Sequence, residues 1–352
     1  VVVLVYVGVS TLNQSEIKNS VDMGIAWLRT QQNWDGSWTW DYDKSHHAGV
    51  TAMALWALLN HGVSNTDPAI TKGLNFILNN IVEDINLYKR WPDDTTKVHN
   101  RSWYYVIEDS DKDNPDYASM YSTALALIAL TEADIDEYHS VIEELRTTIS
   151  LVQNDEDKEN YSTPQSSQWY GGWRYSPYST DADLSVMGFV MMALSTAGLP
   201  INNVTWAEVQ YLLKNWQTEY GSFYYQNRSS TATGPWSMTP SGTLGLALSG
   251  LNTEDLNVQA GLGYIALYDY RYINPDYWDF WNGCRYYGLF YATRAFHAGQ
   301  VSSDFYDKVT ATILSRQDSS GKWVGNGCES DVLATAFALL CMEYNLGEYT
   351  PA

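Results

Sequence analysis

The chain has 352 residues, and its 45% hydrophobic content is enough to build one large core or two ordinary domains. It carries 41 acidic residues against 20 basic ones, and the resulting formal charge of -21 disfavours binding to nucleic acid or to anionic lipid surfaces. The 15 Trp and 27 Tyr residues suit contact with carbohydrate, isoprenoid or protein, and they equally suit a core built from large side chains.

The first segment of the chain is a run of β-branched residues, VVVLVYVGVS at 1–10. This run is too short to cross a bilayer, and its composition favours an extended strand. Because no other segment reads as a partner strand, we expect residues 1–18 to form an extended N-terminal arm and residues 19–352 to form one domain. Pairing of residues 1–12 with a second copy, or with another surface protein, would satisfy the unpaired backbone groups of such an arm.

Two kinds of helical segment alternate after the arm. Segments with one polar face lie at 20–32, 69–81, 141–153, 206–217, 258–269 and 305–317. Each is followed by a segment that is apolar on nearly every face, for example LSVMGFVMMALSTAG at 184–198. An amphipathic helix can face water, whereas a helix that is apolar all round has to be buried. The alternation therefore predicts an all-α fold, an α6/α6 toroid of six helical hairpins; an open solenoid, whose repeats are usually shorter and more uniform, is the alternative.

A second pattern recurs at the joins between the two kinds of helix. Three joins have the spacing Q-x-x-x-G-x-aromatic, running from Gln32 to Trp38, from Gln217 to Phe223 and from Gln317 to Trp323. This is the spacing of the QW repeat, and over nearly its whole length the chain resembles the terpene cyclase and protein prenyltransferase superfamily. In that superfamily the Gln and aromatic side chains tie one helix end to the next hairpin, so the resemblance implies a fold and not a chemistry.

Two chemistries of that superfamily's fold lack their residues in this chain. Zinc-dependent prenyltransferases use D-x-C and a His, but here Asn282 precedes Cys284 and Ala334 stands at the His position. The one remaining thiolate is too few for a catalytic zinc ion. Thioester toroids carry G-C-G-E-Q, of which the stretch at 327–330 keeps only the Gly, the Cys and an acid. The resemblance therefore implies no zinc and no thioester.

The third chemistry is class II cyclisation, in which the middle Asp of D-x-D-D protonates an alkene. The stretch DADL at 181–184 puts Asp183 at the acid position and Asp181 before it, but Leu184 replaces the last Asp. Such cyclases also usually pair two toroids, and this chain has one. The competing interpretation is that Asp183 begins an inner helix, where a carboxylate caps free N–H groups. We favour the cap, because it needs no further assumption.

Aromatic residues cluster in the joins that lead into the expected inner helices. In a toroid these joins collect at one end, so we expect a rim there that binds sugar, isoprenoid or protein; aromatic packing within the joins is the alternative. The candidate rim residues are Trp38, Trp40, Trp103, Trp173, Tyr175, Trp236 and Trp281.

Smaller signals concern metal binding and location. Asp109, Asp111 and Asp113 alternate as at the start of a calcium-binding loop. An EF-hand would need an acidic residue where Met120 stands, so a solvated acidic loop is the default interpretation. No other cofactor is predicted. Cys284 and Cys328 fall at the starts of neighbouring inner helices, where they would form a disulfide in an oxidising compartment. Five N-x-S/T sequons also point to an extracellular or cell-surface protein.

The sequence thus predicts a secreted or cell-surface toroid without a complete catalytic set, which binds partners or assembles with itself through its arm and its aromatic rim. The alternative is a class II cyclase-like enzyme in which Asp183 protonates an isoprenoid.

Overall fold

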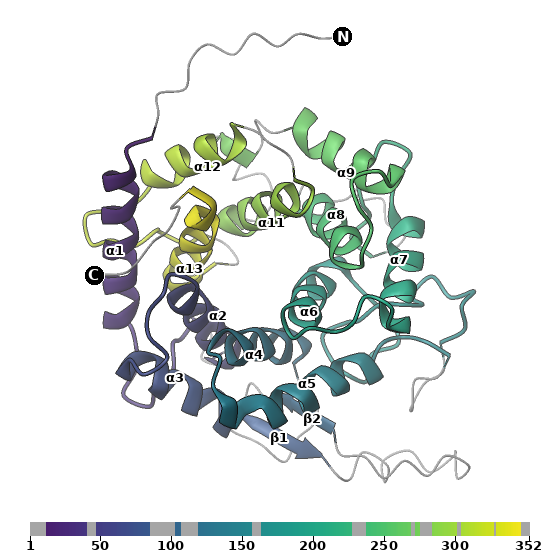
Figure 1. Cartoon of the computed structure of the whole chain (residues 1–352), viewed down its shortest axis with the longest axis horizontal. Coiled ribbons are helices and arrows are strands. Elements are labelled where there is room, and N and C mark those ends of the chain that lie inside the picture. Colours follow the sequence, from purple (N-terminus) through teal and green to yellow (C-terminus); the bar gives the residue numbers. More distant parts are fainter. Residues whose placement is uncertain are drawn as a thin grey trace.

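The computed structural model describes residues 12–40, 47–84, 103–106, 119–156, 163–226, 237–268, 272–274, 284–300, 304–326 and 329–345. Helices in two concentric rings make up most of this part of the chain (Figure 1). The fold is the α/α toroid that the alternation of helices predicts. None of the described helices is long and apolar enough to cross a membrane.

The inner ring consists of helices that are buried on nearly every face; in α6, for example, every residue from Leu184 to Leu194 is buried. Each inner helix packs against the next one, and the last packs against the first, so the ring is closed. Its members are α2 (His47–Asn60), α4 (Met120–Glu132), α6 (Leu184–Thr196), α8 (Met238–Leu248), α11 (Arg285–Ala298) and α13 (Asp331–Met342).

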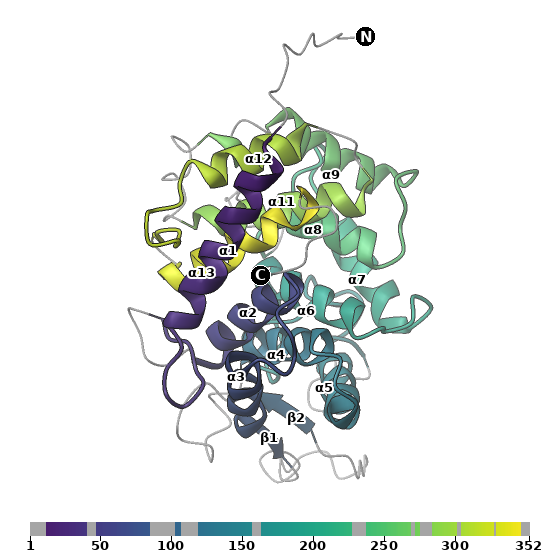
Figure 2. The same cartoon turned by 60° about the vertical axis from the view of Figure 1, so that its left-hand side comes forward.

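The outer ring consists of helices that mostly bury a single stripe, as expected for elements with one face in water. Its members are α1 (Gln14–Thr30), α3 (Pro68–Asn79), α5 (His139–Leu151), α7 (Val204–Trp216), α9 (Leu256–Leu267) and α12 (Phe305–Leu314). Two short 3-10 turns, η3 (Asp136–Tyr138) and η5 (Glu343–Asn345), precede α5 and follow α13. Figure 2 shows α1 lying beside α12 and α13, where the two ends of the ring meet.

The first helix begins earlier than the sequence analysis predicts. Asn13 caps α1 by accepting a hydrogen bond from the Ser15 N–H, and the helix starts at Gln14. The expected boundary between arm and domain at residues 18 and 19 is therefore wrong, because residues 14–18 are helical. Residues 1–11 of the expected arm lie outside the described residues, so their extended conformation stays a prediction.

One pair of strands interrupts the helices. β1 (Ile81–Asp84) runs antiparallel to β2 (Trp103–Val106), with Ile81 opposite Val106. The sequence analysis found no strand other than the arm, and this expectation was wrong. The segments IVED and WYYV are short, but their β-branched and aromatic residues suit a pleated, half-buried surface.

The strand pair takes the place of a glutamine-containing join. The Val106 N–H donates to the Thr123 hydroxyl on α4 at 3.0 Å. At the first join, the Trp38 N–H makes the same bond to the Thr51 hydroxyl on α2 at 2.9 Å. Val106 thus stands where the other joins have an aromatic residue.

The glutamine side chains hold the joins together. The amide of Gln32 donates to the Gly36 carbonyl of its own turn at 3.0 Å and to the Ala69 carbonyl of α3 at 2.8 Å. Gln153 does the same in a join that an insertion lengthens, donating to the carbonyls of Gly171 at 2.9 Å and Thr205 at 3.1 Å. Each such glutamine therefore connects one outer helix to the next.

Gln317 makes the bond that closes the ring. Its amide nitrogen donates to the Gly321 carbonyl and to the Ser20 carbonyl of α1, both at 2.8 Å, and its amide oxygen accepts from the Ser20 hydroxyl at 2.6 Å. Gly321 has a φ of +97°, and a Cβ on it would lie 2.5 Å from the Met23 carbonyl oxygen. The last join packs directly on the first helix, and this close approach requires glycine at position 321.

Gln317→Ala is expected to loosen α1, whereas Gln217→Ala, which removes the equivalent bonds to Gly221 and Asn257, is the matched control. Each change should lower the free energy of unfolding by about 1–3 kcal/mol, because partly buried carbonyls lose their donors. Amide hydrogen exchange separates the two: exchange in α1 should speed up only in Gln317→Ala. Equal exchange of α1 in the two variants would show that this glutamine does not latch the ring.

Candidate functional site at the centre of the toroid

Asp183 is a fully buried residue at the N-terminus of α6. Its Oδ1 accepts hydrogen bonds from the Val186 N–H at 2.9 Å and from the Ser185 hydroxyl at 2.6 Å. Its backbone is extended, with φ of -143° and ψ of 153°, as is usual for the residue before a helix. The Asp183 carboxylate therefore caps the helix.

Arg174 lies against both aspartates of the DADL stretch. Its Nη1 donates to Asp181 Oδ2 at 2.6 Å, and its Nε lies 3.2 Å from Asp183 Oδ2. The second contact is an attraction of charges without the alignment of a hydrogen bond. The two carboxylates differ, because the Asp181 side chain is 43% exposed and that of Asp183 is 0% exposed. Burial raises the pKa of Asp183, opposed by the hydrogen bonds from Ser185 and Val186 and by the charge of Arg174.

A series of hydroxyl groups connects Asp183 with the surface. The Tyr121 hydroxyl donates to the Ser185 oxygen at 2.6 Å, and the Tyr225 hydroxyl lies 3.2 Å from the same oxygen. The hydroxyls of Tyr225 and Tyr175 are 3.3 Å apart, and Tyr175 is 46% exposed. Ser185 and Tyr121 were not among the residues singled out from the sequence, since a Ser and a Tyr at the start of an apolar helix carry no distinctive pattern.

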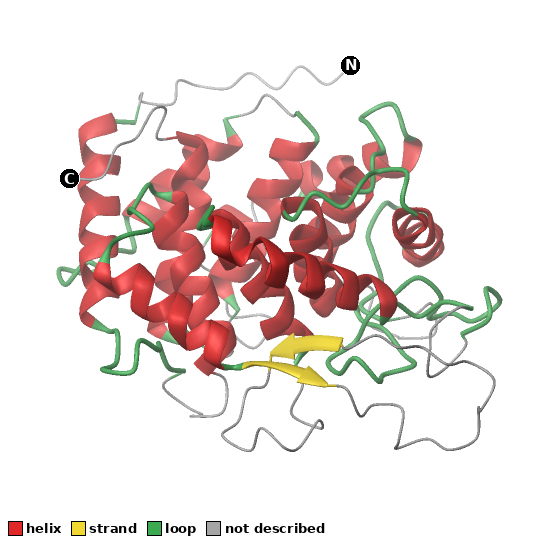
Figure 3. Ribbon diagram, turned by 60° about the horizontal axis from the view of Figure 1, so that its bottom comes forward, coloured by secondary structure: helices red, strands yellow, loops and turns green. Residues whose placement is uncertain are grey.

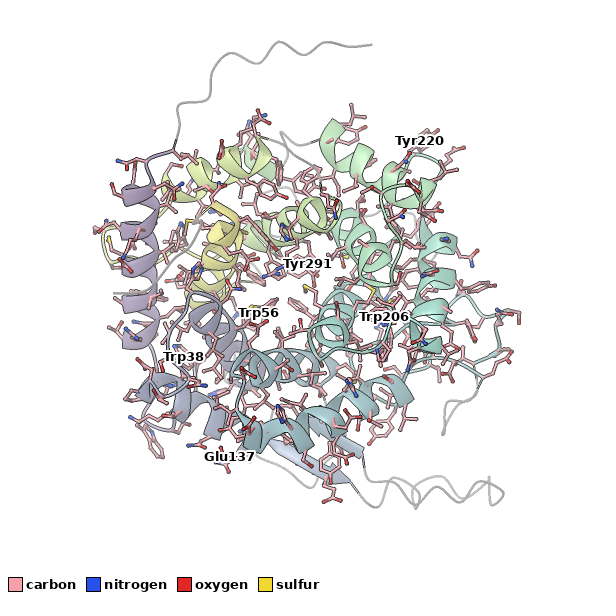
Figure 4. The ribbon with its side chains drawn as sticks, in the orientation of Figure 1. Trp38, Trp56, Glu137, Trp206, Tyr220 and Tyr291 are labelled. Atoms are coloured by element: carbon pink, nitrogen blue, oxygen red, sulfur yellow. The ribbon has the colours of Figure 1, made fainter. Side chains whose placement is uncertain are left out.

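Aromatic rings cross the centre of the toroid. The ring centre of Phe290 on α11 lies 5.5 Å from that of Trp56 on α2 and 6.3 Å from that of Phe189 on α6. These three helices are not neighbours in the inner ring, so the contacts reach across its interior. We call Trp56, Phe189 and Phe290 the central bridge; all three side chains are buried. Figure 4 places Trp56 and Tyr291 inside the inner ring.

The helices around the central bridge carry small residues that allow this close packing. A Cβ on Gly188 would lie 2.4 Å from the Tyr291 hydroxyl and 2.5 Å from the Ser241 hydroxyl on α8. Tyr291 in turn packs against Phe189, with ring centres 5.6 Å apart, and against Phe290 at 5.1 Å. The protein's own side chains thus fill this level of the interior.

A positive charge lies beside the central bridge. The guanidinium carbon of Arg294 is 4.6 Å from the centre of the Trp56 ring and 4.8 Å from that of Phe290, within cation–π range. Its Nη2 also pairs with Glu343 Oε1 at 3.1 Å. The electron-rich faces of these rings are therefore already occupied by a cation of the protein.

Glu329 is a second buried carboxyl group, with 1% of its surface exposed. Its Oε1 accepts a hydrogen bond from the Tyr287 N–H at 2.7 Å, in the first turn of α11, where the N-cap residue Cys284 makes no side-chain capping bond. Burial raises the pKa of Glu329 to about 8, against the lowering effect of hydrogen bonds from the α11 backbone. The sequence analysis considered Glu329 only within an incomplete thioester motif. The helix that it contacts, α11, begins more than 40 residues earlier, so no local spacing connects the two.

The predicted rim residues do not form one group. Trp38 and Trp173 are 0% and 1% exposed, so their assignment to the rim was wrong. Their indoles donate to the Leu28 and Ile149 carbonyls at 2.8 Å each, which places them between the two rings of helices. The remaining candidates are Trp40, which is half-buried; Tyr175, which is exposed; Trp103, whose backbone lies in β2 but whose side chain is not described; and Trp236 and Trp281, which lie outside the described residues.

Three exposed aromatic residues escaped the sequence analysis, and one of them is Tyr211 on α7, which is 40% exposed. The other two are more exposed, Trp34 at 93% and Tyr220 at 76%, and they lie two residues and one residue before the glycine of their glutamine-containing joins. Because the two residues stand at different offsets from the glutamine, an alignment of the joins would not have singled them out. Together with Tyr175, these residues are accessible to a partner, whereas Trp38, Trp173 and Trp323 are buried.

The cysteine and calcium predictions are only partly covered by the structure. Cys284 is disulfide-bonded and Cys341 is a free, buried thiol, while Cys328 lies outside the described residues, so its pairing stays a prediction. Asp109, Asp111 and Asp113 also lie outside them. Among the residues that are described, no three His, Cys, Asp or Glu side chains gather as metal ligands.

The closed double ring defines the chain as an α/α toroid, and no protein-family model and no curated protein matches its sequence. Solved structures do match. The type II terpene cyclase MstE from Scytonema has a TM-score of 0.56 and 14% identity, over 95% of this chain and 99% of the cyclase. Protein geranylgeranyltransferase-I from Candida albicans has a TM-score of 0.62 and 14% identity, over 94% and 92% of the two chains. A GH76 α-mannanase of Bacteroides thetaiotaomicron has a TM-score of 0.59 and 11% identity, over 94% and 97%.

At these identities the likeness establishes the fold alone, an α/α toroid that a terpene cyclase, a protein prenyltransferase and a glycosidase share. The comparison also corrects one argument made from the sequence. This single toroid covers 99% of the MstE chain, so a type II cyclase can work without a second toroid. The lack of a second toroid therefore does not count against a cyclase.

Proposed function

We propose that this chain is a toroid that binds partners and assembles with itself, and is not a class II cyclase. The observation that carries the proposal is the central bridge, in which Phe290 contacts both Trp56 and Phe189. A cyclase needs an open, aromatic-lined space for a folded polyprene, whereas here the rings pack on one another and on Arg294.

The surroundings of Asp183 support the same conclusion. Protonation of an alkene requires a neutral carboxylic acid whose O–H points at the substrate. Both oxygens of Asp183 instead face groups of the protein, namely the Val186 N–H and the Ser185 hydroxyl on one side and Arg174 on the other. Each of these groups favours the ionised form and so opposes the burial that raises the pKa of Asp183.

The binding elements in this proposal are residues 1–12 and the exposed aromatic side chains. Trp34, Tyr175 and Tyr220 present large amphipathic surfaces, which suit contact with another protein. The disulfide at Cys284 and the sequons are consistent with an extracellular or cell-surface location, where disulfides persist.

Sedimentation velocity tests the assembly. The full chain is compared with a chain lacking residues 1–11, which keeps Leu12 against the core and Asn13 as the cap of α1. The full chain should sediment as assemblies that grow with concentration, and the shortened chain should sediment as a folded monomer. If both have the same oligomeric state, residues 1–11 do not mediate assembly and the proposal fails.

The second candidate function is class II cyclisation of an isoprenoid. It is favoured by the burial of Asp183, which raises its pKa, and by the series of hydroxyls that could return a proton from solvent. Among similar structures, a variant of MstE holds geranylgeranyl dihydroxybenzoate as its substrate, and the Candida enzyme holds GGPP. The chain is incubated separately with geranylgeranyl dihydroxybenzoate, with squalene and with geranylgeranyl diphosphate. This candidate predicts a cyclic product that is lost in Asp183→Asn and kept in Asp181→Asn. No product from the unaltered chain removes this candidate.

A further inference from the structure

The hydrogen bonds of β2 show which backbone N–H and C=O groups of β1 point away from the strand pair. The Tyr104 N–H donates to the Thr148 hydroxyl on α5 at 2.9 Å, and the Val106 N–H donates to the Thr123 hydroxyl on α4 at 3.0 Å. Both residues thus direct their backbone groups away from β1. In an antiparallel pair the residues opposite them must do likewise, so Ile81 and Glu83 direct their N–H and C=O groups away from β2.

The two edges of this small sheet therefore differ. The far edge of β2 is covered by threonine side chains of the inner and outer helices. The outer edge of β1 has no strand partner among the described residues, where the sheet consists of two strands only. Figure 3 shows the strand pair at the periphery of the toroid. A two-stranded sheet is marginal, and an open edge readily accepts a further strand.

We propose that residues 1–11 of a second copy add a third strand to the outer edge of β1. This inference rests on the assembly proposed above and names the surface that receives the arm. The segment VVVLVYVGVS is the most β-prone run of the chain, and a four-residue edge offers it the backbone groups of Ile81 and Glu83.

The distance between residues 12–14, where the arm joins α1, and the β1 edge favours an arm from a second copy over the arm of the same chain. In Figures 1 and 2 the start of α1, which follows residues 1–11 in the sequence, lies on the opposite side of the toroid from β1. A contact between one end of a molecule and the other end of its neighbour is head-to-tail. Such a contact does not close on itself after two copies unless the rotation allows it, so assemblies should grow beyond the dimer.

Two substitutions of one residue in the full chain test the acceptor edge. Glu83→Pro removes the outward N–H at a position where an edge strand tolerates proline. Glu83→Ala is the control, because it removes only the carboxylate that hydrogen-bonds the Tyr104 hydroxyl. Sedimentation should show assembly weakened at least about tenfold by Glu83→Pro and unchanged by Glu83→Ala, both variants keeping the circular dichroism of the parent.

The outcomes separate this inference from the function on which it rests. If the chain without residues 1–11 is a monomer but Glu83→Pro still assembles fully, the arm binds elsewhere and the inference is overturned while the assembly stands. If the shortened chain still assembles, both fail.

Hydrogen exchange gives a readout that needs no proline. A synthetic peptide of residues 1–11 with a charged tail is added to the shortened chain, and exchange at the Glu83 amide should slow at least about tenfold. Binding of the peptide with no slowing at Ile81 and Glu83 would contradict pairing at this edge.

Discussion

Asp183→Ala is expected to lower the free energy of unfolding by about 1–3 kcal/mol, the usual cost of leaving a buried N–H group without its acceptor. The change would leave the Val186 N–H without its acceptor, while Arg174 keeps its contact with the partly exposed carboxylate of Asp181. Asp183→Asn keeps an oxygen for the cap, and Asn is as good an N-cap residue as Asp, so this change should cost less than about 1 kcal/mol. Urea unfolding followed by circular dichroism measures both.

The control for this prediction is Asp181→Ala, which removes the other carboxylate that contacts Arg174. The Asp181 side chain is 43% exposed, so its pair with Arg174 is screened by solvent, and the loss should stay below about 1 kcal/mol. The opposite result for Asp183 is informative too. Replacing a catalytic acid that is held in an unfavourable environment often stabilises the protein. An Asp183→Ala chain that is more stable than its parent would therefore favour the cyclase.

Stability is expected to fall as the pH rises from about 5 to about 8, because of Glu329. Burial raises its pKa from 4.5 to about 8 in the folded chain. Between these pH values the folded state holds a proton that the unfolded state has released, so each pH unit should lower the free energy of unfolding by up to about 1.4 kcal/mol. The stabilisation is present in full below the unfolded pKa and is lost as the pH passes the folded one.

Glu329→Gln isolates this effect, because the amide keeps an oxygen for the Tyr287 N–H but cannot ionise. The difference in unfolding free energy between the two chains should change across this pH range, while contributions from other groups cancel. His61 is one such group, since its burial lowers its pKa and its stabilisation is lost on acidification. A difference that does not change with pH would mean that Glu329 is ionised in the folded chain.

Local patterns in the sequence account for the parts of the structure that were predicted. A helix that is apolar on all faces has to be inside, and this alone places α6 in the inner ring. The helix-start reading of Asp183 also depends only on neighbours in sequence, namely the Val186 N–H and the Ser185 hydroxyl. These features lie within one or two turns of the chain, where spacing carries the information.

The features that escaped prediction depend on residues that are distant in sequence. The central bridge brings Trp56, Phe189 and Phe290 together from three non-adjacent helices, and nothing in their spacing indicates that they meet. The partner of Glu329 is 42 residues away, at the Tyr287 N–H. Trp38 was assigned to a rim because the joins were expected at the mouth of the toroid. Its buried indole instead donates to the Leu28 carbonyl of the outer helix α1.

The most direct test of the central claim is a crystal structure of the chain grown with geranylgeranyl diphosphate. The account predicts that Phe290 remains in contact with Trp56 and Phe189, and that no prenyl chain lies between them. A prenyl chain lodged between Phe189 and Phe290, with Asp183 turned from Val186 toward it, would contradict the account.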